Sequence, residues 1–350
     1  MAIIPKNVVC PRCFSKDLYR FGKDKDGFQK YRCKKCKRQF APDNPSFNNR
    51  SRHQRKYPDC PVCGKATFLH HDYTYYSNFR CCDKKCIHSF RVPKLINVVP
   101  PSSELKPQAF SFKGMRHPLY IVLCALNYYF CGNSTTRKVA QTLYMVHQVK
   151  VSHVTVSKWC KRFAPVFKKI AVDRLLSVNL CDSDEWHFDE TYIKIAGKNY
   201  YLWLAFDAET RFVLDFHLSP DRDSNSAHSL LANCRLKFGQ PSSAVVSDRY
   251  YAYQQPASLF FPRAKHIRVE DFDDPINNNN VIEAFNGQFK AWYKPKRGFN
   301  SFESANRLIA TYIFFYNFIR PHSSLNGLTP AQVAGVQYSD KERRFWLLLA

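Results

Sequence analysis

Two pairs of cysteines near the start of the chain constrain its fold more than any other feature. Cys10 and Cys13 form a C-x-x-C pair, and Cys33 and Cys36 form a second pair after 19 intervening residues. So short a segment cannot bury enough apolar surface to fold alone, and four thiolates at this spacing are typical of structural zinc. We therefore predict a zinc ribbon over residues 1–45, with these four cysteines as its ligands.

The same pattern recurs fifty residues later, which indicates an internal repeat. Cys60 and Cys63 repeat the first pair, and Cys86 repeats Cys36. We predict a second zinc ribbon over residues 46–95, in which the fourth ligand is one of Cys81, Cys82 and His88. The repeat alignment favours Cys81. Four protein ligands leave no open coordination position, so both zinc ions are expected to be structural.

The chain is strongly basic, and the excess charge is concentrated in the two cysteine modules. Its formal net charge is +25, and residues 1–98 hold 22 Lys and Arg against 7 Asp and Glu. This charge predicts a polyanionic partner, with nucleic acid as the first expectation. In the first ribbon the predicted phosphate contacts are Lys30, Arg32, Lys34, Lys35, Lys37 and Arg38. The alternative is a solvated charged face or a protein-docking module.

No segment of the sequence predicts export or membrane insertion. The first ten residues lack the apolar core of a signal peptide, and the longest apolar stretch, 119–130, is too short to span a bilayer. Nine of the 14 cysteines precede residue 90, and in a reducing compartment such pairs favour metal over disulfides. We therefore expect a cytoplasmic protein and no membrane partner.

A proline-rich linker is predicted over residues 96–114, between the cysteine modules and a helical unit. Apolar periodicity then predicts helices over 119–130, 134–143 and 152–163, which suit a helix-turn-helix DNA-binding unit within 115–172. Ser152 can cap the last of these helices. The outward residues of that helix are the predicted DNA contacts, namely His153, Thr155, Ser157, Lys158, Lys161 and Arg162. The alternative is a helix pair with a purely structural role.

From residue 185 the apolar pattern changes to the alternation typical of strands. The predicted strands are 186–195, 200–207, 211–218, 244–247 and 266–269, and the predicted helices are 224–236, 280–292 and 302–318. This pattern predicts an α/β fold, a mixed sheet with flanking helices. We expect one domain over 180–335 and a C-terminal tail over 336–350.

Three acids stand where a metal-dependent nuclease or transferase needs them. Asp189 lies among apolar neighbours in the first predicted strand, Asp248 directly follows the strand over 244–247, and Glu283 lies on the helix over 280–292. A charge within such a strand is costly unless it binds something, and two-metal phosphodiester chemistry uses carboxylates on rigid elements. We predict these acids as catalytic residues and as ligands of Mg²⁺ or Mn²⁺. Lys290, two helical turns after Glu283, is predicted to hold a DNA phosphate, and Asn286 shares its face.

Other acids compete for these roles. Glu190 follows Asp189 but is expected on the opposite face of the strand, because side chains alternate. Asp207 ends the second strand and is predicted to be a turn residue. The cluster of Glu270, Asp271, Asp273 and Asp274 is predicted to lie in a solvated loop.

The motifs around the three acids resemble those of a known family. The segments Phe188–Tyr192, Val246–Asp248 and Ile282–Glu283 are similar, in this order, to the acidic motifs of insertion-sequence DDE transposases. The 34 residues between the second and third acids resemble the spacing in the insertion-sequence-six family of bacteria and archaea. Upstream, residues 158–165 are similar to the end of that family's helix-turn-helix.

This resemblance implies a ribonuclease H-like catalytic domain and a transposase. Such an enzyme binds the inverted-repeat ends of its element, cleaves DNA to expose a 3′-hydroxyl and joins that hydroxyl to target DNA with the help of divalent metal. The implied partners are double-stranded DNA and further copies of the chain, in a homodimer or larger assembly. The implied location is the prokaryotic nucleoid. The alternatives are a non-catalytic zinc-dependent DNA-binding protein derived from a transposase and a structure-specific nuclease of the same fold.

Overall fold

The structure is a computed structural model that describes residues 8–44, 57–94, 109, 111, 113–175, 178, 180, 183–269 and 280–344. The chain divides into two compact units, Met1–Asp72 with Asn78–Phe90 and Tyr73–Ser77 with Arg91–Ala350. Within the described ranges, no helix is both long and apolar enough to cross a bilayer. Most of the predicted linker, the acidic cluster of residues 270–274 and the last residues of the predicted tail lie outside the described residues.

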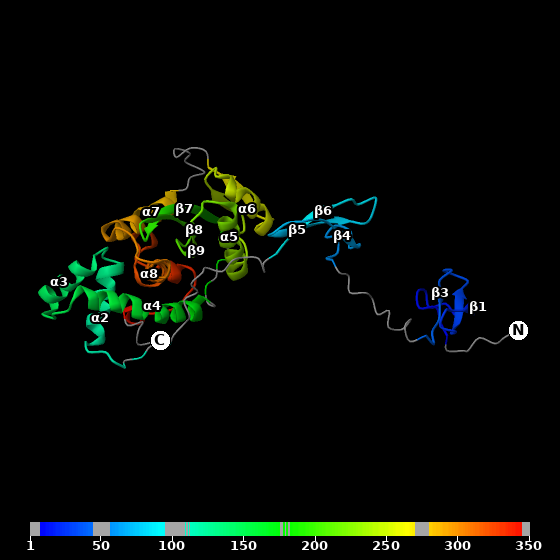
Figure 1. Ribbon diagram of the computed structural model, residues 1–350, viewed down its shortest axis with the longest axis horizontal. Helices are drawn as coiled ribbons and strands as arrows, with labels where there is room; N and C mark the ends of the chain where they lie inside the picture. Colours follow the sequence, from blue (N-terminus) through cyan, green and yellow to red (C-terminus); the bar gives the residue numbers. More distant parts are fainter. Residues whose placement is uncertain are drawn as a thin grey trace. The chain divides into compact units, whose positions relative to one another are not determined.

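Each cysteine repeat folds as a small three-stranded sheet (Figure 1). In the first module β1 (Leu18–Lys23), β2 (Gln29–Cys33) and β3 (Gln39–Phe40) pair antiparallel in that order. In the second module β4 (Thr67–Asp72), β5 (Tyr76–Cys81) and β6 (Ser89–Pro93) follow the same order. The apolar core of the first module is only Leu18, Tyr31 and Phe40 around its cysteines, too little to stabilise a fold without further cross-links.

Three helices begin the larger unit, namely α2 (Leu119–Phe130), α3 (Thr136–His147) and α4 (His153–Leu175). The Thr135 side chain caps α3 by accepting a hydrogen bond from the backbone N–H of Lys138. Ser152 caps α4 in the same way, through the N–H of Thr155. The predicted helical unit is therefore present, with the start of each helix set by a hydroxyl cap or a proline.

The last of these helices, α4, is longer than predicted. It continues past Phe163 and through Pro165, although a proline inside a helix costs about 3 kcal/mol. The buried residues Val166, Phe167 and Ile170 lie in this second half, and α4 packs against α8 (Phe302–Phe314) with the rings of Phe167 and Phe314 stacked at 4.8 Å. Tertiary burial outweighs the local penalty, so the prediction of a helix end at Phe163 was wrong.

A five-stranded mixed sheet forms the centre of the larger unit. Its strands are β7 (Glu185–Ile195), β8 (Lys198–Asp207), β9 (Val213–Ser219), β10 (Ala244–Ser247) and β11 (Lys265–Arg268), in the order β11-β10-β7-β8-β9. β7, β8 and β9 form an antiparallel meander, whereas β10 is parallel to β7 and β11 is parallel to β10. A first strand in the middle, with a meander on one side and parallel strands on the other, is the ribonuclease H-like arrangement. The predicted fold class is confirmed.

Helices cover both faces of this sheet (Figure 1). On one face Trp203 of β8 packs against Tyr253, beside α5 (Ser224–Phe238) and α6 (Gln254–Phe260). On the other face Phe206 packs against Phe285 of α7 (Asn280–Tyr293) and against Tyr316. Tyr316 belongs to a π-helical turn, Phe315–Ile319, that extends α8 as far as the predicted long helix. Two short helices, α9 (Pro330–Val333) and α10 (Asp340–Arg344), follow.

The three-helix segment and the sheet share one hydrophobic core. The Phe130 ring of α2 stacks on Phe315 at 4.9 Å and on Trp292 of α7 at 6.0 Å. Helices α2 and α4 therefore cannot move as a separate domain without exposing these aromatic rings to water. This coupling fixes the position of α4 relative to the strands that carry the acids.

Asp207 is fully buried where β8 turns into β9. Its carboxylate accepts hydrogen bonds from the Ser183 hydroxyl and from both the backbone N–H and the hydroxyl of Thr210. The structure therefore uses this acid as a turn residue, in agreement with the sequence.

We expect Asp207→Ala to lower the free energy of unfolding of this unit by about 3 kcal/mol, because buried donors lose their acceptor. Thermal unfolding followed by circular dichroism measures the change. Glu209→Ala is the control, since Glu209 is exposed in the same turn and its loss should change stability by less than about 0.5 kcal/mol. Equal effects of the two substitutions would contradict the role of Asp207.

Candidate active site and metal centres

The four thiols of the first ribbon converge on one point. Cys10 and Cys13 precede β1, whereas Cys33 ends β2 and Cys36 lies in the turn before β3. The Sγ atoms of Cys10 and Cys36 are 3.4 Å apart, those of Cys13 and Cys33 are 3.5 Å apart, and all four lie within 4.8 Å of one another. Four thiolates on a tetrahedral zinc stand roughly 3.8 Å apart, given Zn–S bonds of about 2.3 Å. The donor set therefore fits Zn²⁺.

The second ribbon forms an equivalent cluster from Cys60, Cys63, Cys81 and Cys86. The Sγ atoms of Cys63 and Cys81 are 3.4 Å apart, and those of Cys60 and Cys86 are 3.8 Å apart. Of the three candidates for the fourth position, Cys81 is the one that joins the cluster, and Cys82 is exposed. The cause is strand alternation at the end of β5, which turns neighbouring side chains in opposite directions.

Backbone hydrogen bonds favour the thiolate form of Cys10 and Cys33 in the first cluster and of Cys60 in the second. Burial opposes ionisation of Cys10, but the N–H groups of Arg12 and Cys13 outweigh it and lower the pKa of Cys10 to about 6. Burial likewise opposes ionisation of Cys60, and the N–H groups of Cys63 and Val62 lower its pKa to about 7. Zinc binds thiolate rather than thiol, so these cysteines favour the form that ligates metal.

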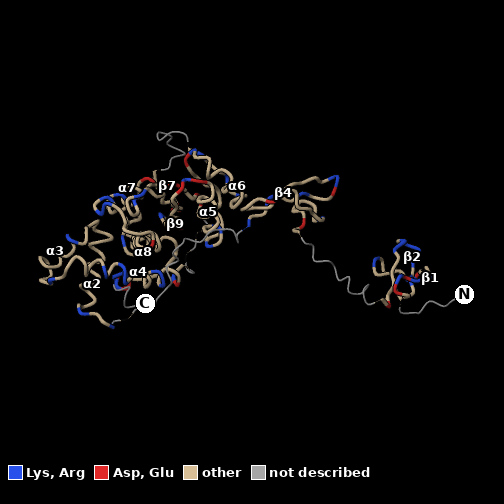
Figure 2. Tube along the Cα trace, in the orientation of Figure 1, with Lys and Arg blue, Asp and Glu red and all other residues tan. Residues whose placement is uncertain are grey.

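The predicted phosphate contacts of the first ribbon lie mostly at its surface. Lys34, Lys35, Lys37 and Arg38 are exposed, and Lys34 contacts Asp17 at 2.9 Å. Lys30 and Arg32 instead cover the ring of Phe21, at 5.7 and 5.3 Å from its centroid. Figure 2 shows these basic segments on the first module. The module thus presents a basic surface that a polyanion can reach.

Most of the predicted DNA contacts on α4 are also accessible. His153, Lys158 and Lys161 are exposed and Thr155 and Ser157 are half-buried, while Val156 and Cys160 face the core. Arg162 is exposed but engaged, since its guanidinium donates to the carbonyl oxygens of Ser111 at 3.1 Å and Lys113 at 2.7 Å. The structure therefore gives Arg162 a role in holding the segment before α2.

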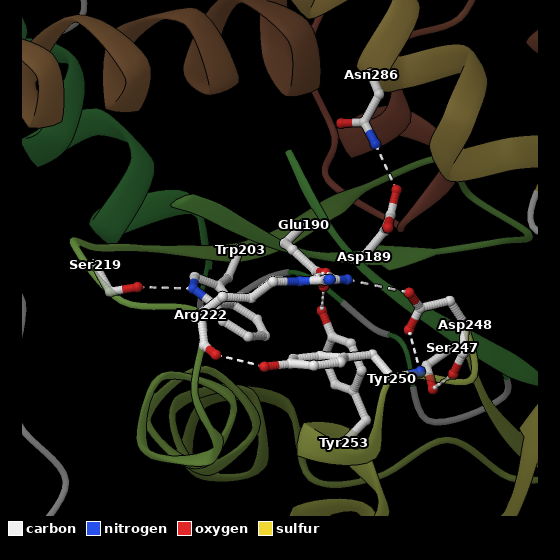
Figure 3. A network of polar contacts seen from close by, with 10 residues as sticks. All are labelled: Asp189, Glu190, Trp203, Ser219, Arg222, Ser247, Asp248, Tyr250, Tyr253 and Asn286. Atoms are coloured by element: carbon white, nitrogen blue, oxygen red, sulfur yellow. Dashed lines mark hydrogen bonds and ion pairs between the residues drawn. The ribbon is translucent and has the colours of Figure 1, made fainter. Parts of the chain in front are cut away.

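Strands β7 and β10 place Asp189 and Asp248 side by side. The parallel register pairs Phe188 with Ser247, so the next residue of each strand is a neighbour across the sheet. Asp248 begins the loop after β10 and accepts a hydrogen bond from the backbone N–H of Tyr250 at 3.0 Å. In Figure 3 Asp189 points toward α7, and the carboxylate of Asp248 points toward Arg222.

Helix α7 brings Glu283 and Asn286 to the same edge of the sheet. The Asn286 Nδ2 donates to Asp189 Oδ2 at 2.7 Å, and Glu283 lies one turn earlier on that helix. Burial, together with the negative charges of Glu190, Asp248 and Glu283, raises the pKa of Asp189 to about 7. The charges of Asp248 and Glu283 are therefore close enough to contribute to the raised pKa of Asp189.

The negative charge of these carboxylates, rather than their spacing, suits a divalent cation. In the described part of the chain, only the two cysteine sets bring three or more ligand atoms within 4.8 Å of one another, so the carboxylates stand wider apart. Their repulsion favours a hard cation that accepts oxygen ligands, such as Mg²⁺ or Mn²⁺. Lys290 lies farther along α7, with its ammonium 5.7 Å from the ring centroid of the exposed Tyr192.

An ion-pair network lies on the opposite face of β7 (Figure 3). The Glu190 side chain, 4% exposed, forms an ion pair with Arg222 and accepts a hydrogen bond from the Tyr253 hydroxyl at 2.6 Å. The Arg222 Nη2 also lies 3.5 Å from Asp248 Oδ2, and its guanidinium stands 3.9 Å from the ring centroid of Tyr250. Arg222 therefore bridges buried Glu190 to Asp248 and offsets part of their negative charge.

Comparison with known proteins agrees with this geometry. Residues 183–322 match the family described as DDE domain, and residues 1–37 match the family described as InsA N-terminal domain. Residues 183–322 are thus similar to a DDE domain. All three predicted acids of the DDE domain lie inside the matched segment, and all four cysteines of the first ribbon lie inside the other.

Curated relatives of the chain include transposases. The chain is 32% identical over 126 residues to the transposase for insertion sequence-like element IS431mec of Staphylococcus aureus, covering 36% of this chain and 54% of that protein. The same values relate it to the transposase for insertion sequence element IS257 in transposon Tn4003, also from Staphylococcus aureus. The chain thus spans about half the length of the curated relatives it matches. The predicted resemblance to insertion-sequence DDE transposases is confirmed.

Among solved structures, the simian T-cell lymphotropic virus intasome in complex with PP2A regulatory subunit B56 gamma is similar. The likeness covers 60% of this chain and 74% of that chain, with 15% sequence identity and a TM-score of 0.36.

The sequence had given no role to two residues that contact Glu190. Arg222 lies in the loop before α5, and Tyr253 ends a 3₁₀ turn, Tyr251–Tyr253, before α6. Both come from parts of the chain far from Glu190, so no local pattern connects them. The sequence feature that could have pointed to these partners was Glu190, because an acid on the buried face of a strand requires a hydrogen-bond donor or a cation.

Proposed function

We propose that this protein is a DNA transposase, which cleaves DNA at the ends of a mobile element and transfers the 3′ ends into target DNA. The observation that carries the proposal is the meeting of Asp189, Asp248 and Glu283 at one edge of a ribonuclease H-like sheet. Its partners are double-stranded DNA, both the inverted-repeat ends and the target, and further copies of the chain in a dimer or larger assembly.

We assign Asp189, Asp248 and Glu283 as ligands of catalytic Mg²⁺ or Mn²⁺, and the two cysteine sets as ligands of structural Zn²⁺. When bound, the catalytic metal polarises the scissile phosphate and lowers the pKa of the attacking water. Asn286 holds Asp189 through its 2.7 Å hydrogen bond, and Arg222 contacts Asp248 from the other face of β7. Both contacts orient a metal-binding carboxylate before DNA arrives.

The number of phosphodiester bonds stays the same in the second step of the reaction. Water first attacks the phosphorus at the element end, the bond from phosphorus to the 3′ oxygen breaks, and a 3′-hydroxyl is released. That hydroxyl then attacks a target phosphodiester, whose own 3′ oxygen leaves. One bond forms for each bond that breaks in the transfer, so joining needs no external energy source. Basic residues of the ribbons, α4 and Lys290 contact the DNA backbone.

The test is strand transfer of a labelled duplex, carrying the DNA that flanks the gene, into a supercoiled plasmid with Mg²⁺ or Mn²⁺. We expect labelled plasmid. Cleavage of the duplex without any joining would replace the proposal with a nuclease of the same fold. Binding without cleavage or joining in either metal would favour a non-catalytic DNA-binding protein.

The Glu190–Arg222 pair gives a further prediction. Glu190→Gln removes the charge that holds Arg222, which can then pair fully with Asp248 and compete with metal for that carboxylate. We expect the Mg²⁺ concentration for half-maximal strand transfer to rise roughly tenfold, in the range found for partners of metal ligands. A titration of activity against Mg²⁺ measures it. Glu185→Gln, on the same strand, is the control, and an unchanged Mg²⁺ requirement in Glu190→Gln would refute this role.

A further inference from the structure

A polar cavity of about 540 Å³ lies between α4 and the segment that joins α7 to α8. It is bordered by the start of α3, by one side of α4, by residues 295–300 and by the start of α8. Two of its lining residues, Ser157 and Lys161, belong to the outward face of α4 that the sequence predicts to contact DNA. The other lining residues come from elements that no DNA contact has been assigned to.

The cavity is lined by cations without matching anions. Arg137, Lys161, Lys296 and Arg297 all contribute to its wall, and no Asp or Glu does. None of the four forms an ion pair with another residue in the described ranges. Four cations around one cavity repel one another, so the binding of an anion there lowers the electrostatic free energy.

Hydrogen-bond donors add to this positive potential. The cavity wall includes Thr135 and Thr136 at the start of α3 and Ser304 in the first turn of α8. Both helices are long enough, at 12 and 13 residues, to carry a dipole whose positive end is the N-terminus. Helix starts, hydroxyl groups and guanidinium groups together form the donor set that binds phosphate.

The wall is held rigidly to the strand that carries Asp189. The Phe299 N–H donates to the Lys194 carbonyl at 2.9 Å, and the Ala196 N–H donates to the Phe299 carbonyl at 2.8 Å, both at the end of β7. Gly298, with a φ of +115°, allows this approach, since a Cβ there would meet the Lys194 oxygen at 3.0 Å. The cavity therefore has a fixed position relative to the catalytic strand.

The Lys296 ammonium is held in the cavity wall by two aromatic rings and a backbone carbonyl. Its ammonium lies 4.6 Å from the ring centroid of Tyr129 and 4.3 Å from that of Trp292, and it donates to the Trp292 carbonyl. Burial lowers the pKa of Lys296 to about 7. An anion in the cavity would stabilise its charged form.

We propose that this cavity binds a backbone phosphate of duplex DNA. The bound phosphate would fix the position of the DNA relative to α4 and to β7, the strand that carries Asp189. The inference rests on the proposed function, because it concerns the path of the DNA that α4 binds. Arg137, Lys296 and Arg297 are the cations it adds to the DNA-binding surface. They position DNA through its backbone and read no base sequence.

The test compares two double variants that lose equal charge. Arg137→Gln with Arg297→Gly removes two cations of the cavity without disturbing the fold. Arg137 is exposed in the first turn of α3, and Arg297 has a φ of +60° that suits glycine. Lys138→Gln with Lys294→Gln removes exposed neighbours that do not line the cavity. Thermal unfolding confirms that both variants are folded.

Fluorescence anisotropy with a labelled duplex from the flanking DNA, without divalent metal, measures Kd at several KCl concentrations. We expect the cavity variant to bind roughly tenfold more weakly and to lose about 1 to 2 from the slope of log Kd against log salt. The control should stay within about threefold of wild type. Equal losses in both variants, or no loss in the cavity variant, would overturn the proposal.

A second arm locates the phosphate. Single neutral methylphosphonates are placed along the duplex, and the position that weakens wild type should have no further effect on the cavity variant. If no position behaves this way while inorganic phosphate binds wild type and not the variant, the cavity holds a small anion and the proposal fails. These measurements need no catalysis, so a chain that binds in this way but never cuts would refute the proposed function alone.

Discussion

Asp189→Asn, Asp248→Asn and Glu283→Gln should each lower the strand-transfer rate by at least about 10³-fold. Each substitution keeps the shape of the side chain and removes a negative charge from the edge of the sheet where the three acids meet. Asparagine at 189 can still accept the hydrogen bond from Asn286, so the fold is preserved. The rate of joining of a labelled duplex to plasmid, at saturating DNA, measures the loss.

DNA affinity separates a catalytic effect from a structural one. We expect each variant to bind the duplex at least as tightly as wild type, because a carboxylate that repels phosphate has been neutralised. Glu209→Gln, which neutralises an exposed acid in the β8–β9 turn, should leave the rate unchanged. A variant of any of the three acids that keeps more than a tenth of the wild-type rate would remove that residue from the active site.

Cys33→Ser should release one zinc ion and unfold the first ribbon. The apolar core of this module is three side chains, so its stability comes from metal binding, which is on the order of 10 kcal/mol in small zinc modules. Zinc content by atomic absorption should fall from two ions per chain to one, and trypsin should cleave within the first module. Loss of the ordered basic surface should weaken DNA binding roughly tenfold.

The second ribbon offers a matched pair of neighbouring cysteines. Cys81→Ser removes a thiol of the cluster, whereas Cys82→Ser removes an exposed thiol outside it. We expect the first to lose one zinc ion and the second to retain both. Zinc loss in Cys82→Ser with retention in Cys81→Ser would reverse the assignment of the fourth ligand.

Local patterns in the sequence were sufficient for much of the fold. The C-x-x-C repeat predicts two ribbons because thiol spacing is a local property, and the periodicity over 119–130 and 244–247 coincides with α2 and β10. The order of three acids on a strand, a strand end and a helix also predicts that they meet, because ribonuclease H-like topology brings the first and fourth strands of its sheet together.

Long-range packing decided the rest. Pro165 lies inside α4 because aromatic burial against α8 outweighs a local penalty. Glu190 finds Arg222, and the four cations of the cavity meet, through contacts between elements far apart in sequence. Periodicity reports which face of an element is buried, but not what buries it. Local sequence patterns therefore predicted most of the helices and strands, the thiol clusters and the three acids, whereas long-range packing set which charges face one another around them.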